Sequence, residues 1–243
     1  MEIFAVKREN HALVPSREAM MRLLTEEIQK RVIRFREWED AERVIVADFL
    51  VRFLFSRKTG SNINDIVIER DGYGKPFIRN KEQLHFNVSH SGNWVVCAID
   101  NQAVGIDVEQ VRPLETEELA MRFFSNEEYQ AIVDKPLEQR LESFYDLWTL
   151  KESFVKAEGK GLFIPLNSFT IKIRNDRITV KHSNAKEDNN KYFFKRYLID
   201  EDYRMSACGS TPEFPSRIQY LDFSFLFQEI HKQDKDTLQR MES

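Results

Sequence analysis

The sequence predicts an α+β fold made of two pseudo-twofold-related halves, each with helices packed on a small antiparallel sheet. Three observations predict it. The chain of 243 residues, 42% of them hydrophobic, is long enough for one large core or two ordinary ones. The order strand, helices, antiparallel strands occurs twice, on either side of residue 102. Cys97 and Cys208 each lie near the end of the return strand of the last hairpin in a half. We therefore expect the active site between the halves.

Composition and charge exclude several classes of protein. With 19 Phe and only 8 Gly the chain is neither collagen-like nor disordered. The formal net charge of -4 does not suggest nucleic-acid binding, although basic residues gather locally at 30–36, which suits a local anionic ligand. Charges interrupt the apolar start of the chain too early for a signal peptide, and no apolar run of transmembrane length follows. We expect a cytoplasmic protein with no membrane partner and with both cysteines as buried, reduced thiols.

The first half, residues 1–102, begins with an apolar run at 3–6 that predicts a strand. Ser16 is placed to cap a helix over 16–34, because apolar residues then recur three and four positions apart. A similar stripe predicts a second helix at 39–57. The rest of the half is predicted as a strand at 66–69, a turn at 71–74, and a hairpin of 84–88 with 94–100 around a turn at 89–93.

The second half, residues 103–221, repeats this order. Its predicted elements are a strand at 104–109, helices at 125–133 and 140–157, and strands at 169–173, 177–181, 192–199 and 203–208. The tail, residues 222–243, alternates apolar residues with charges, which predicts a helix packed on the body; a helix that binds a partner is the alternative.

Two carboxylates stand one residue apart in the run Gly105-Ile106-Asp107-Val108-Glu109. Alternate residues of a strand share a face, so Ile106 and Val108 can enter a core while Asp107 and Glu109 turn together into a cleft. A hard divalent cation such as magnesium, which takes oxygen ligands, would relieve their repulsion. The alternative is a solvated strand edge with two acids of no special function.

The predicted helix around Trp148 carries charged residues in unusual places. Lys151 falls near the middle of an apolar stripe that runs from Phe144 to Val155, where it can reach the edge of the core or meet an anion in a cleft. Glu152 flanks the stripe and Lys156 follows at i+4. As a surface ion pair these two would contribute only about 0.2 to 0.5 kcal/mol.

Together these motifs resemble the paired signatures of the 4'-phosphopantetheinyl transferases, G-[IV]-D-[IV]-E and W-[ST]-x-K-E-[SA]-x-x-K. Residues 105–109 match the first and residues 148–156 match the second without a gap or substitution. The resemblance extends to 74–76 and 86–91 in the first half. Length and the two halves are similar to the larger, Sfp-type (surfactin-synthetase-activating-like) branch rather than to the short trimeric branch, which implies a monomer.

The resemblance implies transfer of phosphopantetheine from coenzyme A to a serine hydroxyl of an apo peptidyl or acyl carrier domain, with release of 3',5'-adenosine bisphosphate. It makes Asp107, Glu109 and Glu152 ligands of Mg²⁺. Glu152 is also the general base, directly or through a metal-bound water. Lys156 would stabilise the transition-state charge of the diphosphate, and Lys151 would help to position phosphate.

The resemblance also implies a set of residues that hold coenzyme A, namely Arg43, Lys75, Ser89, His90 and, for the 3'-phosphate, Arg31. Ser89 and His90 are expected on a turn, where polar groups can converge on phosphate. The pattern departs from the family at Ile28, where a lysine is expected. Binding of the 3'-phosphate is then expected to be weaker, or Lys30 supplies the missing positive charge.

Carrier domains present an acidic helix beside the target serine, and residues 121–125 resemble the family's docking region. Arg122 and an exposed aromatic ring would serve there. The alternative is that Phe123 and Phe124 belong to the core. Two other functions use the same residues: a metal-dependent phosphohydrolase or nuclease that gathers the three acids around metal ions, and a protein that docks carrier domains without modifying them.

Overall fold

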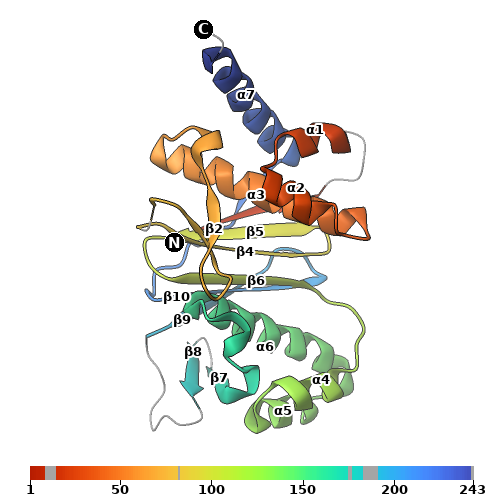
Figure 1. The fold of residues 1–243 in the computed structure, drawn as a ribbon. Coiled ribbons are helices and arrows are strands. Elements are labelled where there is room, and N and C mark those ends of the chain that lie inside the picture. Colours follow the sequence, from red (N-terminus) through yellow and green to blue (C-terminus); the bar gives the residue numbers. More distant parts are fainter. Residues whose placement is uncertain (9–14, 82, 175–176, 183–190, 242–243) are drawn as a thin grey trace.

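The computed structural model describes residues 1–8, 15–81, 83–174, 177–182 and 191–241. Two sheets, antiparallel except for one edge strand, lie face to face in the middle of the molecule, with helix α3 (Trp38–Thr59) on the outer side of one and α6 (Leu137–Glu158) on the outer side of the other (Figure 1). The predicted fold class is confirmed. Sheet pairing follows the order β11-β1-β5-β4 in the first sheet and β6-β10-β9 in the second.

The strands of the first sheet are β1 (Glu2–Lys7), β4 (His85–Ser91), β5 (Trp94–Asp100) and β11 (Gln219–Leu221). Those of the second are β6 (Val104–Gln110), β9 (Phe193–Tyr197) and β10 (Tyr203–Gly209). Two hairpins lie outside the sheets, β2 (Ile68–Arg70) with β3 (Pro76–Ile78) and β7 (Phe169–Arg174) with β8 (Arg177–His182). Short 3₁₀ turns occur at Ile63–Asp65, Gly161–Phe163 and Leu166–Ser168.

The halves repeat each other element by element. In each, a strand leads into short helices, then a 22-residue helix, a two-stranded hairpin, and two strands that complete the sheet. Both long helices end at a left-handed glycine, Gly60 (φ 68°) and Gly159 (φ 78°), a conformation that glycine adopts without steric cost. The short helices of the second half are α4 (Thr116–Phe123) and α5 (Asn126–Val133).

Three apolar clusters hold these layers together. One lies between α3 and the first sheet, one between α6 and the second sheet with its hairpin, and one between the two sheets. Val104, Ile106 and Val108 are fully buried in the cluster between the sheets, as the alternation along this strand predicts. Their neighbours at 105, 107 and 109 therefore face α6. Cys97 and Cys208 are buried and free, as expected.

Two local predictions were wrong. The helix predicted over 16–34 is two helices, α1 (Arg17–Arg22) and α2 (Glu26–Val32), because Thr25 caps a new start by accepting a hydrogen bond from the Ile28 amide. The turn predicted at 89–93 is shorter: β4 continues to Ser91, and only Gly92 and Asn93 make the turn. Ser89 and His90 therefore lie on a strand, where their side chains point to opposite faces.

The end of the chain returns to the first half. Strand β11 pairs parallel with β1, and helix α7 (Phe223–Met241) buries Phe223, Leu226 and Ile230 against α3. The prediction of a packed tail helix is confirmed. No strand was predicted at 219–221; these residues lie inside the second half as bounded from the sequence, but β11 belongs to the sheet of the first half. Within the described residues, no helix combines the length and apolar character needed to span a membrane.

Candidate active site

Strands β4 and β6 lie side by side where the halves meet, and they run parallel. Among the described residues no backbone ladder joins them. Side chains from every second residue of β4 bridge the gap instead. The bridges join Asn87 Oδ1 to the Ile106 amide (2.8 Å), Ser89 Oγ to Asp107 Oδ1 (2.8 Å), and Ser91 Oγ to Glu109 Oε2 (2.8 Å) and the Gln110 amide (3.1 Å). We call this row the β4–β6 seam.

Helix α6 rests directly on β6 at Gly105. A Cβ atom at this position would lie 1.9 Å from the Ser153 carbonyl oxygen and 2.5 Å from the Ala157 amide nitrogen, so only glycine fits. This close approach brings the side chains of Glu152 and Lys156 to the face of β6 that carries Asp107 and Glu109. The first residue of the signature is thus a packing requirement, and a glycine inside a predicted strand is the sequence signal for it.

Asp107 is the most buried acid of this cleft, with 2% of its surface exposed. Its Oδ1 accepts hydrogen bonds from Ser89 Oγ and from Lys156 Nζ at 2.6 Å. Lys156 Nζ also reaches Ser89 Oγ (3.0 Å) and the Ile106 carbonyl (3.2 Å). The other oxygen, Oδ2, is buried without a hydrogen-bond partner. An unsatisfied carboxylate oxygen in a closed site is costly unless a donor or a cation meets it.

Two further acids, Glu109 and Glu152, line the same cleft together with Trp148. Burial, followed by the charge of Asp107, raises the pKa of Glu109 to about 7. The same two causes raise the pKa of Glu152. Acids that oppose one another's ionisation favour a cation among them. In the part of the chain that the structure describes, no set of three or more His, Cys, Asp or Glu side chains is already gathered into a metal cluster.

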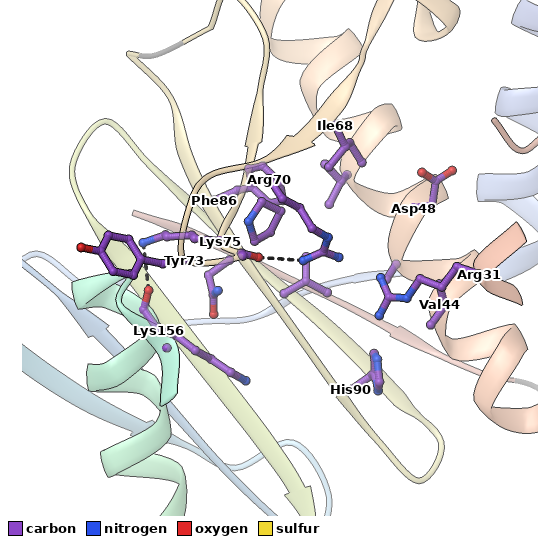
Figure 2. A pocket seen from close by; sticks show the side chains of 18 of the residues that line it. Arg31, Val44, Asp48, Ile68, Arg70, Tyr73, Lys75, Phe86, His90 and Lys156 are labelled. Atoms are coloured by element: carbon purple, nitrogen blue, oxygen red, sulfur yellow. Dashed lines mark hydrogen bonds between the residues drawn. The ribbon is translucent and has the colours of Figure 1, made fainter. Parts of the chain in front are cut away.

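A second, mainly apolar pocket opens beside this cleft between the two halves (Figure 2). Its walls include Ile28 of α2, Val44 of α3 and Phe86 of β4, and its basic side chains are Arg31, Arg70, Lys75, His90 and Lys156. Val88, His90 and Lys156 line both the pocket and the cleft, so the two spaces are adjacent. The arrangement suits a ligand with an apolar body and several anionic groups.

Burial and the neighbouring charges together determine the protonation state of His90. Partial removal from water, and then the charges of Arg43, Lys156 and Arg31, lower the pKa of His90 to about 4. Lys75 lies deeper, where burial lowers its pKa, and its Nζ donates to the carbonyls of Lys156 (2.8 Å) and Ala157 (3.1 Å). It thereby ties a turn of the first half to the carboxyl end of α6.

Comparisons of the sequence with known proteins indicate one enzyme family. Residues 103–208 match the family model described as the 4'-phosphopantetheinyl transferase superfamily, and residues 14–102 match the 4'-phosphopantetheinyl transferase N-terminal model. The chain is 36% identical to the 4'-phosphopantetheinyl transferase Sfp of Bacillus subtilis over 93% of this chain and 100% of that protein. The chain belongs to the 4'-phosphopantetheinyl transferase superfamily.

Other relatives carry the same name. The chain is 35% identical to the 4'-phosphopantetheinyl transferase psf-1 of Bacillus pumilus, over 77% of this chain and 79% of that protein. It is 35% identical to the 4'-phosphopantetheinyl transferase gsp of Aneurinibacillus migulanus, over 76% of each. The prediction of the family and its enzyme class, made from residues 105–109 and 148–156, is confirmed.

Most of the predicted phosphopantetheinyl transferase residues come together. Asp107, Glu109, Glu152, Lys156, Ser89 and His90 line the cleft, and Arg31 and Lys75 line the adjoining pocket. Arg43 lies on the other side of His90, where it forms an ion pair with Asp40 and donates to the Gly92 carbonyl at 3.0 Å.

Lys151 does not reach the cleft. Its Nζ donates to both oxygens of Glu128 and to the Phe169 carbonyl, each at 2.7 Å, and the side chain is fully buried. Burial lowers the pKa of Lys151 to about 8. The predicted phosphate contact is therefore not supported, because all three donors of this ammonium group are already bonded on the opposite side of α6. Lys30, the alternative for the 3'-phosphate, is 64% exposed and paired with Glu26 away from the pocket.

Sequence reasoning missed Asn87, Ser91, Gly105 and Arg70 as parts of the site. The signal for the first two was present, since 87, 89 and 91 are alternate polar residues on one strand. No signal pointed to Arg70, because its place depends on how the β2–β3 hairpin folds over the pocket.

Proposed function

We propose that this chain transfers the 4'-phosphopantetheine group of coenzyme A to a serine hydroxyl of an apo peptidyl or acyl carrier domain, releasing 3',5'-adenosine bisphosphate. The observation that carries the proposal is the position of Lys156. It lies where the three-acid cleft meets the apolar, cationic pocket. A diphosphate placed there would have its apolar and nucleotide parts in the pocket and its reacting phosphorus next to the acids.

The cleft fits a divalent metal ion. Asp107, Glu109 and Glu152 would hold Mg²⁺, because the buried Oδ2 of Asp107 has no partner, and because burial and then the charge of Asp107 raise the pKa of both glutamates, a cost that a bound cation relieves. When bound, the ion would neutralise diphosphate charge and orient its oxygens.

The remaining chemistry belongs to this chain's own side chains. The serine oxygen bonds to the phosphorus on the pantetheine side, and the bond from that phosphorus to the bridging oxygen breaks. Glu152 accepts the serine proton; burial raises the pKa of this carboxyl, which brings it closer to the range useful for a base. Lys156 stabilises the negative charge that develops on the departing adenosine bisphosphate, and His90 donates to phosphate in its neutral form.

The carrier domain would dock beside helix α4. Arg122 is exposed and lies over the Phe123 ring at 5.0 Å, and Met121 is 65% exposed. Phe123 packs edge-on against Trp148, which lines the cleft, whereas Phe124 is buried against Phe144 and belongs to the core. A cationic and apolar surface next to the cleft suits an acidic helix. We propose that the chain acts as a monomer, since both sides of the site come from one polypeptide.

The test is an incubation of the protein with coenzyme A, Mg²⁺ and an apo carrier domain, followed by the intact mass of the carrier. A phosphopantetheine adduct on the carrier serine is the expected result. Hydrolysis of coenzyme A without an adduct would refute this proposal and support the alternative, a metal-dependent phosphohydrolase. No change in either molecule would leave a protein that binds carrier domains without modifying them.

A further inference from the structure

The turn of the β2–β3 hairpin reaches the second half beside the apolar pocket. Tyr73, in this turn, and Phe163, in the 3₁₀ turn that follows α6, meet edge to face, with ring centroids 5.5 Å apart and an interplanar angle of 82°. The two residues belong to different halves and are 55% and 75% exposed. The ring pair is therefore a weak contact between the halves at the surface, outside the three apolar clusters.

Residues 71–76, which we call the hairpin tip, are rigid within themselves. Asp71 Oδ1 accepts hydrogen bonds from the amides of Tyr73 (2.8 Å) and Lys75 (2.9 Å). The Gly74 amide donates to the Asp71 carbonyl at 3.0 Å, and the Asp71 amide donates to the Lys75 carbonyl at 3.0 Å. These bonds close the turn on itself, so the hairpin tip can move as one piece.

Among the described residues, side-chain contacts and no backbone hydrogen bond tie the hairpin tip to the second half. Tyr73 meets Phe163, and Lys75 reaches to the backbone of Lys156 at the end of α6, as Figure 2 shows. The corresponding hairpin of the second half, β7–β8, is instead fixed by the fully buried Lys151, which donates to its backbone. The tip of the first hairpin is the more weakly attached of the two, which is typical of segments that open locally.

The hairpin tip has open space on both of its sides. Tyr73, Lys75 and Gly159 line the apolar pocket, and they also line a further pocket behind the hairpin, whose other walls include Phe77 and Leu84. The tip is therefore a partition between two spaces. Because it is a wall of the apolar pocket, its movement into the space behind it would widen that pocket, at the cost of the ring contact and the Lys75 hydrogen bonds.

We propose that the hairpin tip is a clasp, held closed by Tyr73 and Phe163, whose opening sets the rate at which coenzyme A enters the pocket and 3',5'-adenosine bisphosphate leaves it. The inference rests on the proposed function and deepens it, since it gives the co-substrate its route. Opening of such a segment commonly limits the release of product. Phe163 does not itself line the pocket, so its removal weakens the clasp without changing the binding surface.

The first test is the rate of nucleotide exchange. Stopped-flow fluorescence follows the 2'-N-methylanthraniloyl derivative of 3',5'-adenosine bisphosphate as it binds to and leaves the full chain in Mg²⁺. Phe163→Ala should raise the association and dissociation rate constants by the same factor, about fivefold for the loss of one edge-to-face pair, and leave Kd unchanged. Phe163→Tyr keeps the ring and should keep both rates. Leu137→Ala, the matched control, removes another apolar side chain that is 75% exposed, at the start of α6, and should change neither rate.

The second test needs no nucleotide. Acetylation of Lys75 by acetic anhydride, quantified by peptide mass spectrometry, measures opening, because the amine is bonded to two backbone carbonyls while the clasp is closed. Phe163→Ala should raise the labelling rate of Lys75 about fivefold relative to that of the exposed Lys30, and Leu137→Ala should not.

An unchanged labelling rate of Lys75 in Phe163→Ala would overturn the clasp, whether or not the protein is a transferase. Faster dissociation with a higher Kd and unchanged association would also overturn it, because Phe163 would then only support the pocket wall. Failure of the nucleotide derivative to bind the unaltered protein would refute the proposed function and the exchange role with it, while the labelling of Lys75 still decides whether the hairpin tip opens.

Discussion

The two lysine–carboxylate pairs of helix α6 lie on different faces and have opposite surroundings. On the core face, Lys151 and Glu128 are both buried, and the carboxylate also accepts hydrogen bonds from the amides of Ser125 and Ile171. On the cleft face, Lys156 meets Asp107 through one oxygen only, and the second oxygen has no partner. We call Lys151–Glu128, whose hydrogen bonds are complete, the closed pair, and Lys156–Asp107 the open pair. The closed pair joins α5 and β7 to the helix. The open pair retains binding capacity for a ligand, so completeness of hydrogen bonding, more than burial, separates structure from function here.

The largest expected effect is on the open pair. Asp107→Ala removes both carboxylate oxygens from the cleft and should lower Mg²⁺-dependent transfer by about 10³-fold or more, as expected for loss of a metal ligand and its charge stabilisation. The melting temperature should change by only a few degrees, since no other carboxylate depends on Asp107 for its partner. Carrier mass spectrometry and circular dichroism measure the two quantities. Wild-type turnover in this variant would refute the role of the cleft.

The closed pair should behave in the opposite way. Lys151→Ala leaves Glu128 buried without its cation and should lower the free energy of unfolding by about 3 to 5 kcal/mol, as measured by urea denaturation. Activity per folded molecule should remain, because Lys151 lies on the side of α6 away from the cleft. The double variant Lys151→Met with Glu128→Gln should recover much of the stability. A loss of activity in folded Lys151→Ala would restore the phosphate contact predicted from the sequence.

Lys156→Ala is the matched control for that experiment, on the same helix five residues away. It should lower kcat by about 10²- to 10³-fold and lower the free energy of unfolding less than Lys151→Ala does, since the Lys156 side chain is partly in water and Asp107 still accepts a hydrogen bond from Ser89. If Lys151→Ala instead lost activity while Lys156→Ala lost stability, the contrast between the two pairs would be wrong.

A smaller effect is expected at Ser91, which orients Glu109 from across the seam. Ser91→Ala removes the 2.8 Å hydrogen bond to the carboxylate. Because groups that orient metal ligands typically change metal affinity by about tenfold or more, the Mg²⁺ concentration for half-maximal activity should rise about tenfold, while kcat at saturating Mg²⁺ stays near its original value. A fall in kcat that added Mg²⁺ does not repair would contradict this role.

The smallest effect concerns His90, on the open side of the cleft. The folded-state pKa of about 4 lies below the ordinary value of 6.5, so between these pH values the unfolded chain binds a proton that the folded chain does not. The free energy of unfolding therefore falls as the pH decreases from 6.5 to 4. His90→Gln should reduce this fall by about 1 kcal/mol or less, because the side chain is partly in water. Thermal melts at pH 7 and pH 5 provide the measurement, and an unchanged difference between them would show that His90 does not carry the linkage.

The sequence predicted those parts of the site that depend on local periodicity. Alternation along β6 placed Asp107 and Glu109 on one face, and the helical repeat placed Glu152 and Lys156 together. The direction of Lys151 could not be predicted in this way, because it is decided by Glu128, 23 residues away, and by the Phe169 carbonyl.

Long-range folding accounts for the other differences as well. The pairing of β11 with β1 joins residues more than two hundred positions apart, which no local pattern records. Likewise, Arg31 and Arg70 approach each other only because α2 and the β2–β3 hairpin flank one pocket. The prediction of the turn at 89–93 was wrong for a simpler reason. The Gly92-Asn93 pair is sufficient for a turn, so the polar residues before it remain in strand β4.

The β4–β6 seam gives the site a register. The polar side chains of β4 recur every two residues, and each hydrogen-bonds to β6, so the strands can align only in steps of two residues. A slip of one step would set Ser89 against Glu109 and leave Asp107 opposite an amide side chain. The half that holds most of the apolar pocket and the half that holds the acids are thereby aligned along β4 and β6 by three side chains, without a backbone ladder between the two strands among the described residues.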